Sequence, residues 1–415
     1  MSRSEPALRI DLDRARAHWH HRHGLGAPVT GKLEDVVAAT GWPRTLGGVD
    51  VYLAVRARAP GMSRRDLDEA VEQSRLQVIP AVRGCIYLVP RSMVPLVLRV
   101  AEEQQRKRTD RDLEKVGCSE EEIAAVGEAV LAALKKGPLS TDAIRKAMPE
   151  GTVRSFGEKG KKIGLSSPLP PALRHLEFQG KLERTLEGGR LDTERYLWRL
   201  VKKSPFTGAK IPANPNARYA AIARVFFQQN GPATLKDFAA WTALPQRDAR
   251  AAMDLAGLAP VAVDGYADDA FALEEDVPAL REAAPPVESL SMLSFEDNYV
   301  TQHGGPGLMT HPRHQNRPIA AWGDAKAGTL GDTKHIAMRT IFDGDRLAGM
   351  WEYDPDAEAV VVGTFDPLPA KRRSALDALA ADVGKFLRED IGHARCFSLD
   401  TTDAIRERAA LVKAM

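Results

Sequence analysis

The chain has 415 residues, of which 44% are hydrophobic and 27% are charged, and its formal net charge is +2. This composition is that of an ordinary globular protein, and the length excludes a single small module because it allows two to four domains with cores of their own. Neither a signal peptide nor an apolar run long enough to span a bilayer is found, so we expect a cytoplasmic protein without a membrane partner.

The first 115 residues predict helices followed by a hairpin. Ser63 precedes a predicted helix, with Asp66 at the spacing of a capping box. Helices are expected over residues 7–25, 33–40, 50–59 and 64–73, and paired strands over residues 77–90. This order is typical of a winged helix, and we assign it to residues 1–115.

A second winged helix is predicted over residues 116–213. Its helices are expected over residues 120–136, 141–148 and 171–180, and a hairpin turns at Gly188-Gly189 between residues 181–185 and 195–200. Residues 151–164 hold three lysines among glycines, so we expect a loop that could lie on a phosphate backbone.

The pattern then repeats over residues 214–286. Gly231-Pro232 ends one helix and precedes the next, as Gly137-Pro138 does in the preceding unit, which is the self-similarity of a tandem repeat. Helices are expected over residues 219–230, 235–242 and 247–256, followed by residues 259–273 and a boundary at Pro285-Pro286. We predict a third winged helix here.

The C-terminal segment, residues 287–415, changes to β-rich character. Successive antiparallel strands are expected over residues 337–342, 347–353 and 359–365, and a closing helix over residues 371–388. The predicted fold class is therefore α+β, with tandem winged-helix domains followed by a β-barrel-like domain.

Charge is unevenly distributed along the chain. Residues 135–210 hold 17 lysine or arginine residues against 8 acidic residues, a net charge of +9. Duplex DNA is attracted to such a segment, although a solvated basic surface is the alternative.

Metal and cofactor sites are not predicted. The three cysteines are isolated in sequence, and the histidines of the first helix, His18, His20, His21 and His23, lack an i, i+4 pair backed by a carboxylate. We expect neither a metal nor a cofactor.

The most informative stretch begins with the glycine turn Gly47-Gly48, which opens into an apolar run that carries Asp50 and Tyr52. Glycines allow close backbone approach and arginines pair with phosphate oxygens, so this combination suits a phosphate-bearing ligand. A buried turn with a capping aspartate is the structural alternative. The candidate DNA-binding residues are Arg56, Arg58, Arg83, Tyr87, Lys159, Lys161, Lys162 and Arg174.

Four segments carry a resemblance to a known family. They are Gly47-Gly48-Val49-Asp50-Val51-Tyr52, Arg83-Gly84-Cys85-Ile86-Tyr87-Leu88-Val89, residues 230–241 and Met292-Leu293-Ser294-Phe295-Glu296-Asp297-Asn298-Tyr299. With residues 342–351, they resemble the AlkZ-like (YcaQ-like) DNA glycosylases, also described as winged-helix DNA-binding domain proteins.

The resemblance implies tandem winged helices and a β-barrel around a basic face for duplex DNA, and excision of alkylated bases or crosslinks. Family members use two polar residues one apart, commonly Gln-x-Gln or Gln-x-Asp, directly after the glycine turn. Asp50 and Tyr52 stand at those positions here, and Tyr87 stands where the family often has histidine.

The residues themselves can be matched to that chemistry. An N7-alkylated purine is a cationic leaving group, so a site has to stabilise an oxocarbenium-like sugar and position a water, which a carboxylate such as Asp50 can do. Tyr52 could donate one hydrogen bond or stack on a base or sugar. Glu296 and Asp297 form a second acidic pair, either near the same groove or as loop caps.

Three hypotheses follow for function. The first is a monomeric DNA glycosylase that hydrolyses the N-glycosidic bond of alkylated or bulky-adduct purines in double-stranded DNA, with Asp50 and Tyr52 as the catalytic pair. The second is a non-catalytic winged-helix DNA-binding protein, since the glutamines are replaced. The third is a scaffold that does not bind DNA, which predicts no salt-dependent duplex binding.

Overall fold

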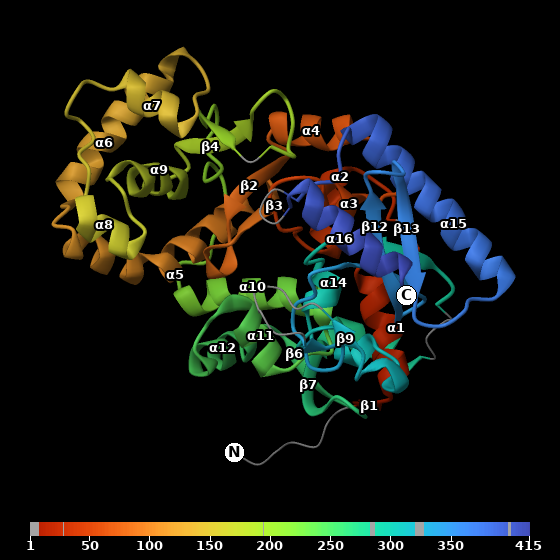
Figure 1. Ribbon diagram of the computed structural model, residues 1–415. Helices are drawn as coiled ribbons and strands as arrows, with labels where there is room; N and C mark the ends of the chain where they lie inside the picture. Colours follow the sequence, from red (N-terminus) through yellow and green to blue (C-terminus); the bar gives the residue numbers. More distant parts are fainter. Residues whose placement is uncertain (1–7, 28, 194, 283–286, 320–327, 397–399) are drawn as a thin grey trace. The chain divides into compact units, whose positions relative to one another are not determined.

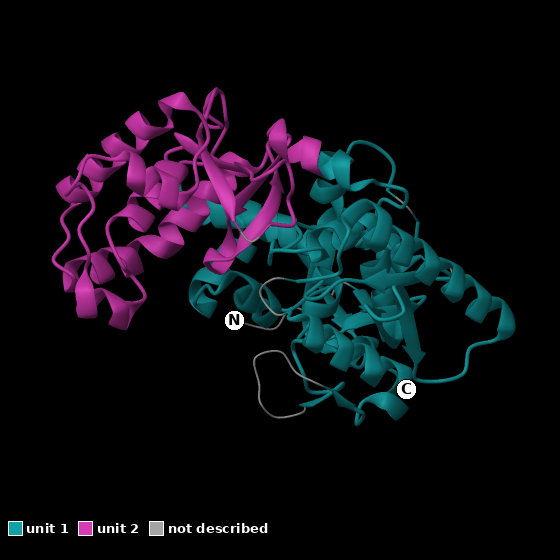
Figure 2. Ribbon diagram, turned by 45° about the horizontal axis from the view of Figure 1, so that its top comes forward, with its two compact units in different colours: residues 1–67, 214–415 teal, residues 68–213 magenta. Residues whose placement is uncertain are grey.

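The chain divides into two compact units, coloured separately in Figure 2. The computed structural model describes residues 8–27, 29–193, 195–282, 287–319, 328–396 and 400–415. Unit 1 comprises residues 1–67 and 214–415, and unit 2 comprises residues 68–213. The predicted first domain, residues 1–115, is therefore shared between the units, with the division inside α4 (Arg64–Glu72). The finer division into four domains stays a prediction, and its boundary at Pro285-Pro286 lies outside the described residues.

Unit 2 consists of helices and two antiparallel hairpins. Its helices are α5 (Val94–Lys115), α6 (Glu120–Ala133), α7 (Thr141–Ala147), α8 (Gly157–Ile163) and α9 (Leu169–Phe178), and its hairpins pair β2 (Leu76–Pro80) with β3 (Ile86–Pro90) and β4 (Leu182–Leu186) with β5 (Tyr196–Leu200). Val126, Leu173 and Trp198 belong to an apolar core formed by α6, α9 and the second hairpin. Both hairpins confirm the sequence prediction.

The segment predicted as a loop, residues 151–164, contains α8. Gly157 and Gly164 have φ angles of +55° and +70°, and Gly164 forms the C-cap of α8. A side chain on Gly160 would place its Cβ 2.1 Å from the Leu165 carbonyl oxygen. These glycines therefore allow a short, closely packed helix, and the loop prediction was wrong for residues 157–163.

Unit 1 combines the N-terminal helices with everything after residue 213. Its helices are α1 (Leu12–Arg22), α2 (Leu33–Thr40), α3 (Asp50–Arg56), α10 (Pro215–Asn230), α11 (Leu235–Thr242), α12 (Gln246–Met253), α13 (Val277–Arg281), α14 (Asn298–Thr301), α15 (Ala370–Lys385) and α16 (Thr402–Lys413). Its strands are β1 (Leu8–Ile10), β6 (Leu258–Val263), β7 (Ala267–Leu273), β8 (Leu290–Leu293), β9 (Pro318–Ile319), β10 (Gly328–Thr329), β11 (Arg339–Asp343), β12 (Arg346–Asp354) and β13 (Ala359–Thr364).

The internal repeat is visible in the backbone hydrogen bonds. After α6 and its Gly-Pro pair, Leu139 exchanges two hydrogen bonds with Trp198 on β5, at 3.0 and 2.8 Å. After α10 and its Gly-Pro pair, Ala233 exchanges two hydrogen bonds with Phe271 on β7, at 2.9 and 2.8 Å. In both segments one residue therefore bridges to the second strand of a hairpin. A capped helix follows that residue in the sequence.

The C-terminal strands form an open sheet. Their order is β13-β12-β11-β8, with antiparallel pairing throughout, so the described strands do not close into a barrel. Helix α16 packs on β12 and β13, and α15 packs on β13 and β8 (Figure 1). Because helices cover the sheet, its apolar side chains are buried without closure. The prediction of a β-barrel-like domain was therefore wrong, because the described strands form an open sheet. The predicted α+β class is confirmed.

The N-terminal stretch is tied to a distant hairpin. Strand β1 pairs in parallel with β6, with Leu8 opposite Val261, and Asp11 then caps α1 by accepting a hydrogen bond from the Arg14 amide at 2.7 Å. The predicted helix over residues 7–25 is therefore a strand followed by a shorter helix. Trp19 on α1 is fully buried in a core with residues of β6, β8 and β11.

Two further properties concern the described part of the chain. No helix there is both long and apolar enough to cross a membrane. Likewise, no three or more histidine, cysteine, aspartate or glutamate side chains among these residues are grouped so as to hold a metal ion.

Candidate functional site

The glycine turn before α3 is pressed against a C-terminal segment. Gly48 has a φ of +87°, and a Cβ at this position would lie 2.0 Å from the carbonyl oxygen of Arg395. The same carbonyl accepts a hydrogen bond from the Val49 amide at 3.0 Å. Both the backbone conformation and the close approach require glycine, so the turn fixes the start of α3.

We expect Gly48→Ala to destabilise unit 1 strongly. Gly61 provides a matched control because its φ is also +87° and nothing lies within 4 Å of a Cβ built there. Gly61→Ala should cost about 1–2 kcal/mol for the left-handed conformation alone, and Gly48→Ala about 1–3 kcal/mol more for the overlap. Urea denaturation of both variants measures the difference, and equal losses would contradict the close approach.

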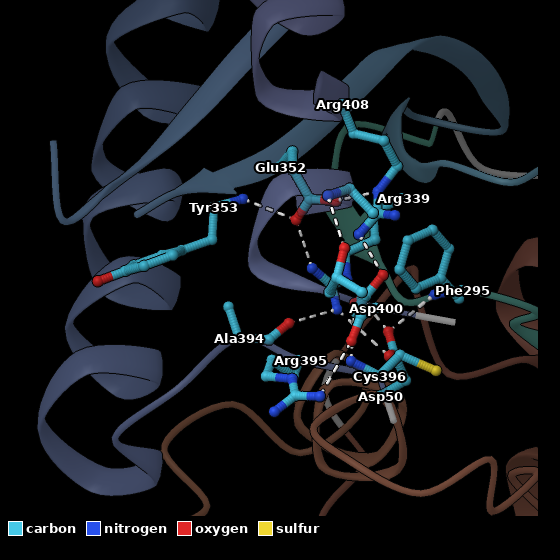
Figure 3. Close-up of polar contacts among 12 residues, drawn as sticks. Asp50, Phe295, Arg339, Glu352, Tyr353, Ala394, Arg395, Cys396, Asp400 and Arg408 are labelled. Atoms are coloured by element: carbon cyan, nitrogen blue, oxygen red, sulfur yellow. Dashed lines mark hydrogen bonds and ion pairs between the residues drawn. The ribbon is translucent and has the colours of Figure 1, made fainter. Parts of the chain in front are cut away.

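Asp50, the first residue of α3, is held in a buried ion pair (Figure 3). Asp50 is only 3% exposed. Oδ1 accepts hydrogen bonds from the Phe295 amide at 3.0 Å and from Arg339 Nε at 3.1 Å, and Oδ2 accepts from Arg339 Nη2 at 3.2 Å. Asp50 therefore fixes α3 to both β11 and the segment after β8.

Arg339 connects Asp50 to a larger charged network. Its Nη1 donates to Glu352 Oε1 on β12 at 2.5 Å, and its Nη2 also donates to the Ala394 carbonyl at 3.0 Å. Burial by itself lowers the pKa of Arg339, but the charges of Asp50 and Glu352 outweigh it and raise that pKa well above its ordinary value. Arg339 is thus a permanent buried cation.

Helix α16 completes the network. Arg408 donates to Glu352 Oε2 at 2.6 Å and to Asp400 Oδ1 at 2.7 Å, while the Cys396 amide donates to Asp400 Oδ2 at 2.8 Å (Figure 3). Elements distant in sequence are therefore joined through alternating charges. We call Asp50, Arg339, Glu352, Arg408 and Asp400 the Asp50 network.

A small cavity borders Asp50. Its volume is about 20 Å³, which is room for a single water molecule. The polar and charged residues that line it include Thr40, Arg44, Asp50, Arg58, Glu296 and Asp297. The acidic pair after β8 and the aspartate after the glycine turn therefore face a common space.

Asp297, which also lines this cavity, is paired with Arg58. Arg58 donates to its two carboxylate oxygens at 2.7 and 2.8 Å, and its Oδ1 accepts from the Tyr299 amide at 3.0 Å, which caps α14. Burial alone would raise the pKa of Asp297, but the charge and hydrogen bonds of Arg58 hold it below its ordinary value. Asp297 is thus a stably ionised cap.

Glu296 has a different environment. Its Oε2 accepts from Arg44 Nη1 at 2.5 Å, and both of its oxygens lie 3.0 Å from His335 Nδ1. Its backbone φ is +52°, which few residues other than glycine adopt. Glu296 therefore joins an arginine and a histidine that are far from it in sequence.

The other candidates in unit 1 are placed away from the cavity centre. Tyr52 is fully buried on α3. Arg56 donates to the Met62 carbonyl at 2.6 Å and to Asp382 at 2.8 Å, and its guanidinium lies 4.5 Å from the centre of the Phe386 ring. These contacts attach Arg56 to α15 and to the segment that follows it. A role for Arg56 in DNA binding stays a prediction.

The candidates in unit 2 fall into exposed and buried groups. Arg83 and the three lysines of the α8 segment, Lys159, Lys161 and Lys162, are exposed, with Lys161 paired to Glu158 at 2.6 Å. Tyr87 is buried on β3, and Arg174 on α9 pairs with Glu177 at 3.0 Å. Exposed cations can meet phosphate, so they are the stronger candidates for a DNA surface.

Several residues of the site were missed by sequence reasoning, among them Arg339, Glu352, Arg408, Arg44 and His335. Arg339 carried one available signal, because it is a charged residue within an otherwise apolar predicted strand, and a buried charge needs a partner. No comparable signal marks His335, which lies outside any predicted element.

Comparison with known proteins defines the class. A model of the family described as DNA glycosylase AlkZ-like matches residues 48–386, so the chain belongs to the AlkZ-like DNA glycosylase family. The fold is similar to that of the Streptomyces sahachiroi DNA glycosylase AlkZ, with a TM-score of 0.68 and 19% identity over 94% of this chain and 98% of that one. No curated protein matches the chain. The resemblance predicted from the sequence is confirmed.

Proposed function

We propose that the protein is a DNA glycosylase that hydrolyses the N-glycosidic bond of alkylated or bulky-adduct purines in duplex DNA. The observation that carries this proposal is the family match over residues 48–386, which includes Gly48, Asp50 and the acidic pair after β8. We expect it to act as a monomer in the cytoplasm, where its DNA substrate would be accessible.

Asp50 has a defined part in this proposal. Two of its hydrogen bonds fall on Oδ1 and one on Oδ2, so Oδ2 keeps a lone pair for a water in the adjacent cavity. A carboxylate there also stabilises the positive charge that develops on the sugar as the bond breaks. Asp50 would therefore position the water and stabilise the oxocarbenium-like sugar, with Tyr52 supporting α3 from the core.

DNA binding would use two repeated units. In both segments a helix, a one-residue bridge and a capped helix precede a hairpin, with α8 and α9 before the first hairpin and α12 before the second. This order supports a winged helix over α6 to β5 and another over α10 to β7. Residues 135–210 carry the excess positive charge, and the exposed Arg83, Lys159, Lys161 and Lys162 would contact phosphates. The side chains of Arg58, Tyr87 and Arg174 are buried or paired, so we assign them an indirect part in DNA binding, each within its own unit.

A second candidate function is a DNA-binding protein without glycosylase activity. The observation that favours it is the pairing of both Asp50 oxygens with Arg339, because each oxygen then already accepts a hydrogen bond from a guanidinium. Such a protein would use the same basic surface and leave the bases in place.

We expect Asp50→Asn to slow single-turnover release of 7-methylguanine from duplex DNA by at least about 10²-fold, because the water loses its carboxylate. Tyr52→Phe, which removes only a hydroxyl, should have a smaller effect. Asp382→Asn serves as control, because this exposed acid of the same unit lies in the pair with Arg56 rather than in the cavity. Thermal melts of each variant separate a catalytic loss from unfolding.

The two candidate functions give different results with the wild-type protein. Base release establishes a glycosylase. Absence of release from 7-methylguanine and from a bulkier N7 adduct, together with duplex binding that weakens as salt rises, would favour the non-catalytic protein.

A further inference from the structure

We propose that unit 2 holds a binding site for one phosphate group, in a pocket between the β4-β5 hairpin and the start of α7. This inference rests on the proposed DNA-binding function, because it names one place where a phosphate of the duplex backbone would be held. The pocket has a volume of about 310 Å³, which is room for several water molecules and therefore for a phosphate. The residues that line it include Ser140, Thr141, Asp142, Arg184, Arg195 and Trp198.

Backbone pairing brings these residues together. Arg184 on β4 lies opposite Trp198 on β5, and the central carbon of its guanidinium is 4.9 Å from the centre of the Trp198 ring. Leu139 bridges to Trp198, so Ser140 and Thr141, which follow Leu139, lie beside the same strand. Trp198 Nε1 then donates to Thr141 Oγ1 at 3.2 Å. The pocket is thus formed by elements of unit 2 alone.

Arg184 is a buried cation whose charge is incompletely neutralised. The residue is 9% exposed, and its Nη2 donates to Glu177 Oε2 at 3.2 Å. The same oxygen accepts from Arg174 Nη1 at 3.0 Å, so two guanidinium groups share one carboxylate and one positive charge is left over. Burial lowers the pKa of Arg184, and the charge of Glu177 only partly offsets this effect. A bound anion would supply the missing negative charge.

The pocket also offers hydrogen-bond donors. A guanidinium has five N–H groups, and in the described part of the chain those of Arg184 reach only Glu177 and, at 3.5 Å, the Val78 carbonyl. The Thr141 hydroxyl accepts from the Trp198 indole, and among the described residues its own proton has no acceptor. Phosphate oxygens only accept hydrogen bonds, and their bonds with arginine are charge-assisted and strong. This set of donors therefore fits a phosphate.

Two exposed charged residues complete the lining. The side chains of Arg195 and Asp142 are 72% and 73% exposed, and Arg195 Nη1 lies 3.7 Å from Asp142 Oδ2. Such a long, exposed ion pair is weak, so Arg195 can exchange it for a phosphate at little cost. Asp142 repels the same phosphate. Removal of one of these charges should therefore weaken phosphate binding, and removal of the other should strengthen it.

The repeated segment of unit 1 lacks these donors. There Ala233 bridges to Phe271, and Leu235 comes two residues after the bridge. Leu235 and Phe271 thus stand where Thr141 and Trp198 stand in unit 2, so both the hydroxyl and the indole N–H are replaced by apolar groups. The phosphate site is therefore a property of unit 2 rather than of the repeat.

The first test is fluorine NMR of the full chain labelled with 5-fluorotryptophan, because Trp198 lines the pocket and is the only tryptophan in the sequence of unit 2. Trp198→Phe assigns the resonance. Addition of an unmodified DNA duplex should shift this resonance, and Arg195→Gln should reduce the shift. Arg108→Gln is a matched control and should leave the shift unchanged, since Arg108 on α5 is also exposed and also lies 3.7 Å from an acid, Asp112.

Duplex affinity provides a second readout. Arg195→Gln should reduce the slope of the logarithm of affinity against the logarithm of salt concentration by about 1, because one phosphate contact is lost. Asp142→Asn should raise the affinity about 2- to 5-fold, the usual effect of one exposed charge. Asp110→Asn is its control and should leave the affinity unchanged, since Asp110 is an exposed acid on α5 that lies 3.9 Å from Arg106. A merely structural role would not give the two pocket variants opposite effects.

A titration with inorganic phosphate separates the sources of the phosphate group. A shift of the Trp198 resonance with duplex that Arg195→Gln reduces supports a backbone phosphate in the pocket. A shift with inorganic phosphate but not with duplex would support the site and overturn DNA as its source. No shift with either, or equal effects of Arg195→Gln and Arg108→Gln, would overturn the site. None of these measurements depends on base release, so the phosphate site and the glycosylase activity fail or stand separately.

Discussion

Replacing Arg339 by methionine should destabilise unit 1 by about 3–5 kcal/mol, the usual cost of removing one partner from a buried ion pair. The loss arises because Asp50 and Glu352 would remain buried as carboxylates without their shared cation. Methionine matches much of the volume of arginine, so the result isolates the charge and its hydrogen bonds. The change in the urea midpoint measures it.

An exposed arginine of the same unit provides the control for this prediction. Arg406 pairs with Asp356 at 2.9 Å, and both side chains are about half exposed. Arg406→Met should leave the urea midpoint nearly unchanged, because water screens an exposed ion pair. A second variant that adds Asp50→Asn and Glu352→Gln to Arg339→Met should recover part of the lost stability, because it removes the uncompensated charges. Equal costs for Arg339→Met and Arg406→Met would refute the Asp50 network as a stabilising element.

The stability of unit 1 should fall steeply below neutral pH. His20, His23 and His303 are buried, and burial lowers their pKa values to about 4, 3 and 4 respectively. The unfolded chain titrates near 6.5, so it binds protons that the folded state excludes. Stability is therefore fully present above pH 6.5, and it is lost as pH falls from 6.5 toward 4.

The expected size of this loss is large. Between pH 8 and pH 5 each of these histidines should contribute about 2 kcal/mol of destabilisation, so the total reaches several kcal/mol. Urea midpoints followed by tryptophan fluorescence report mainly unit 1, because five of the six tryptophans belong to its residues.

Variants assign the pH dependence to the buried rings. His23→Gln should reduce the slope of the free energy of unfolding against pH between pH 6.5 and 4, since the His23 ring lies 3.1 Å from Asn230 in a buried hydrogen bond. His21→Gln controls for the loss of a histidine at this end of α1, because His21 is exposed in the last turn of the helix that His23 caps. A slope unchanged by His23→Gln would show that other groups produce the acid sensitivity.

Local chemistry made much of the fold predictable. Ser63 and Asp66 form the expected capping interactions at 2.9 and 3.2 Å, and Thr234 and Asp237 form a complete capping box. Such signals involve residues three apart, so the sequence contains the whole interaction. The hairpins at β2-β3 and β4-β5 were predictable because each joins two strand-like runs that are close together in the sequence.

Long-range pairing was not predictable in this way. Asp50 could be identified as unusual from its place after a glycine turn, but its partner Arg339 lies 289 residues further along the chain. The pairing of β1 with β6 joins residues 253 apart, and a stretch of three strand residues carries too little pattern to reveal it. The open C-terminal sheet depended on α16, a helix that the sequence reading did not assign.

The division of unit 1 into two stretches has a consequence for synthesis on the ribosome. Residues 1–67 are made before unit 2, but their partners follow only after all of unit 2, whose translation takes about 7–30 s at ordinary rates. Unit 2 can therefore complete its own core before Arg339, the partner of Asp50, and β6, the partner of β1, have been made. Because Arg408 lies on α16, the Asp50 network is finished only after that helix has left the exit tunnel. The nascent glycine turn and α3 thus depend on a helix made long after them, and release of the chain before α16 is made would leave the catalytic candidate without its structural support.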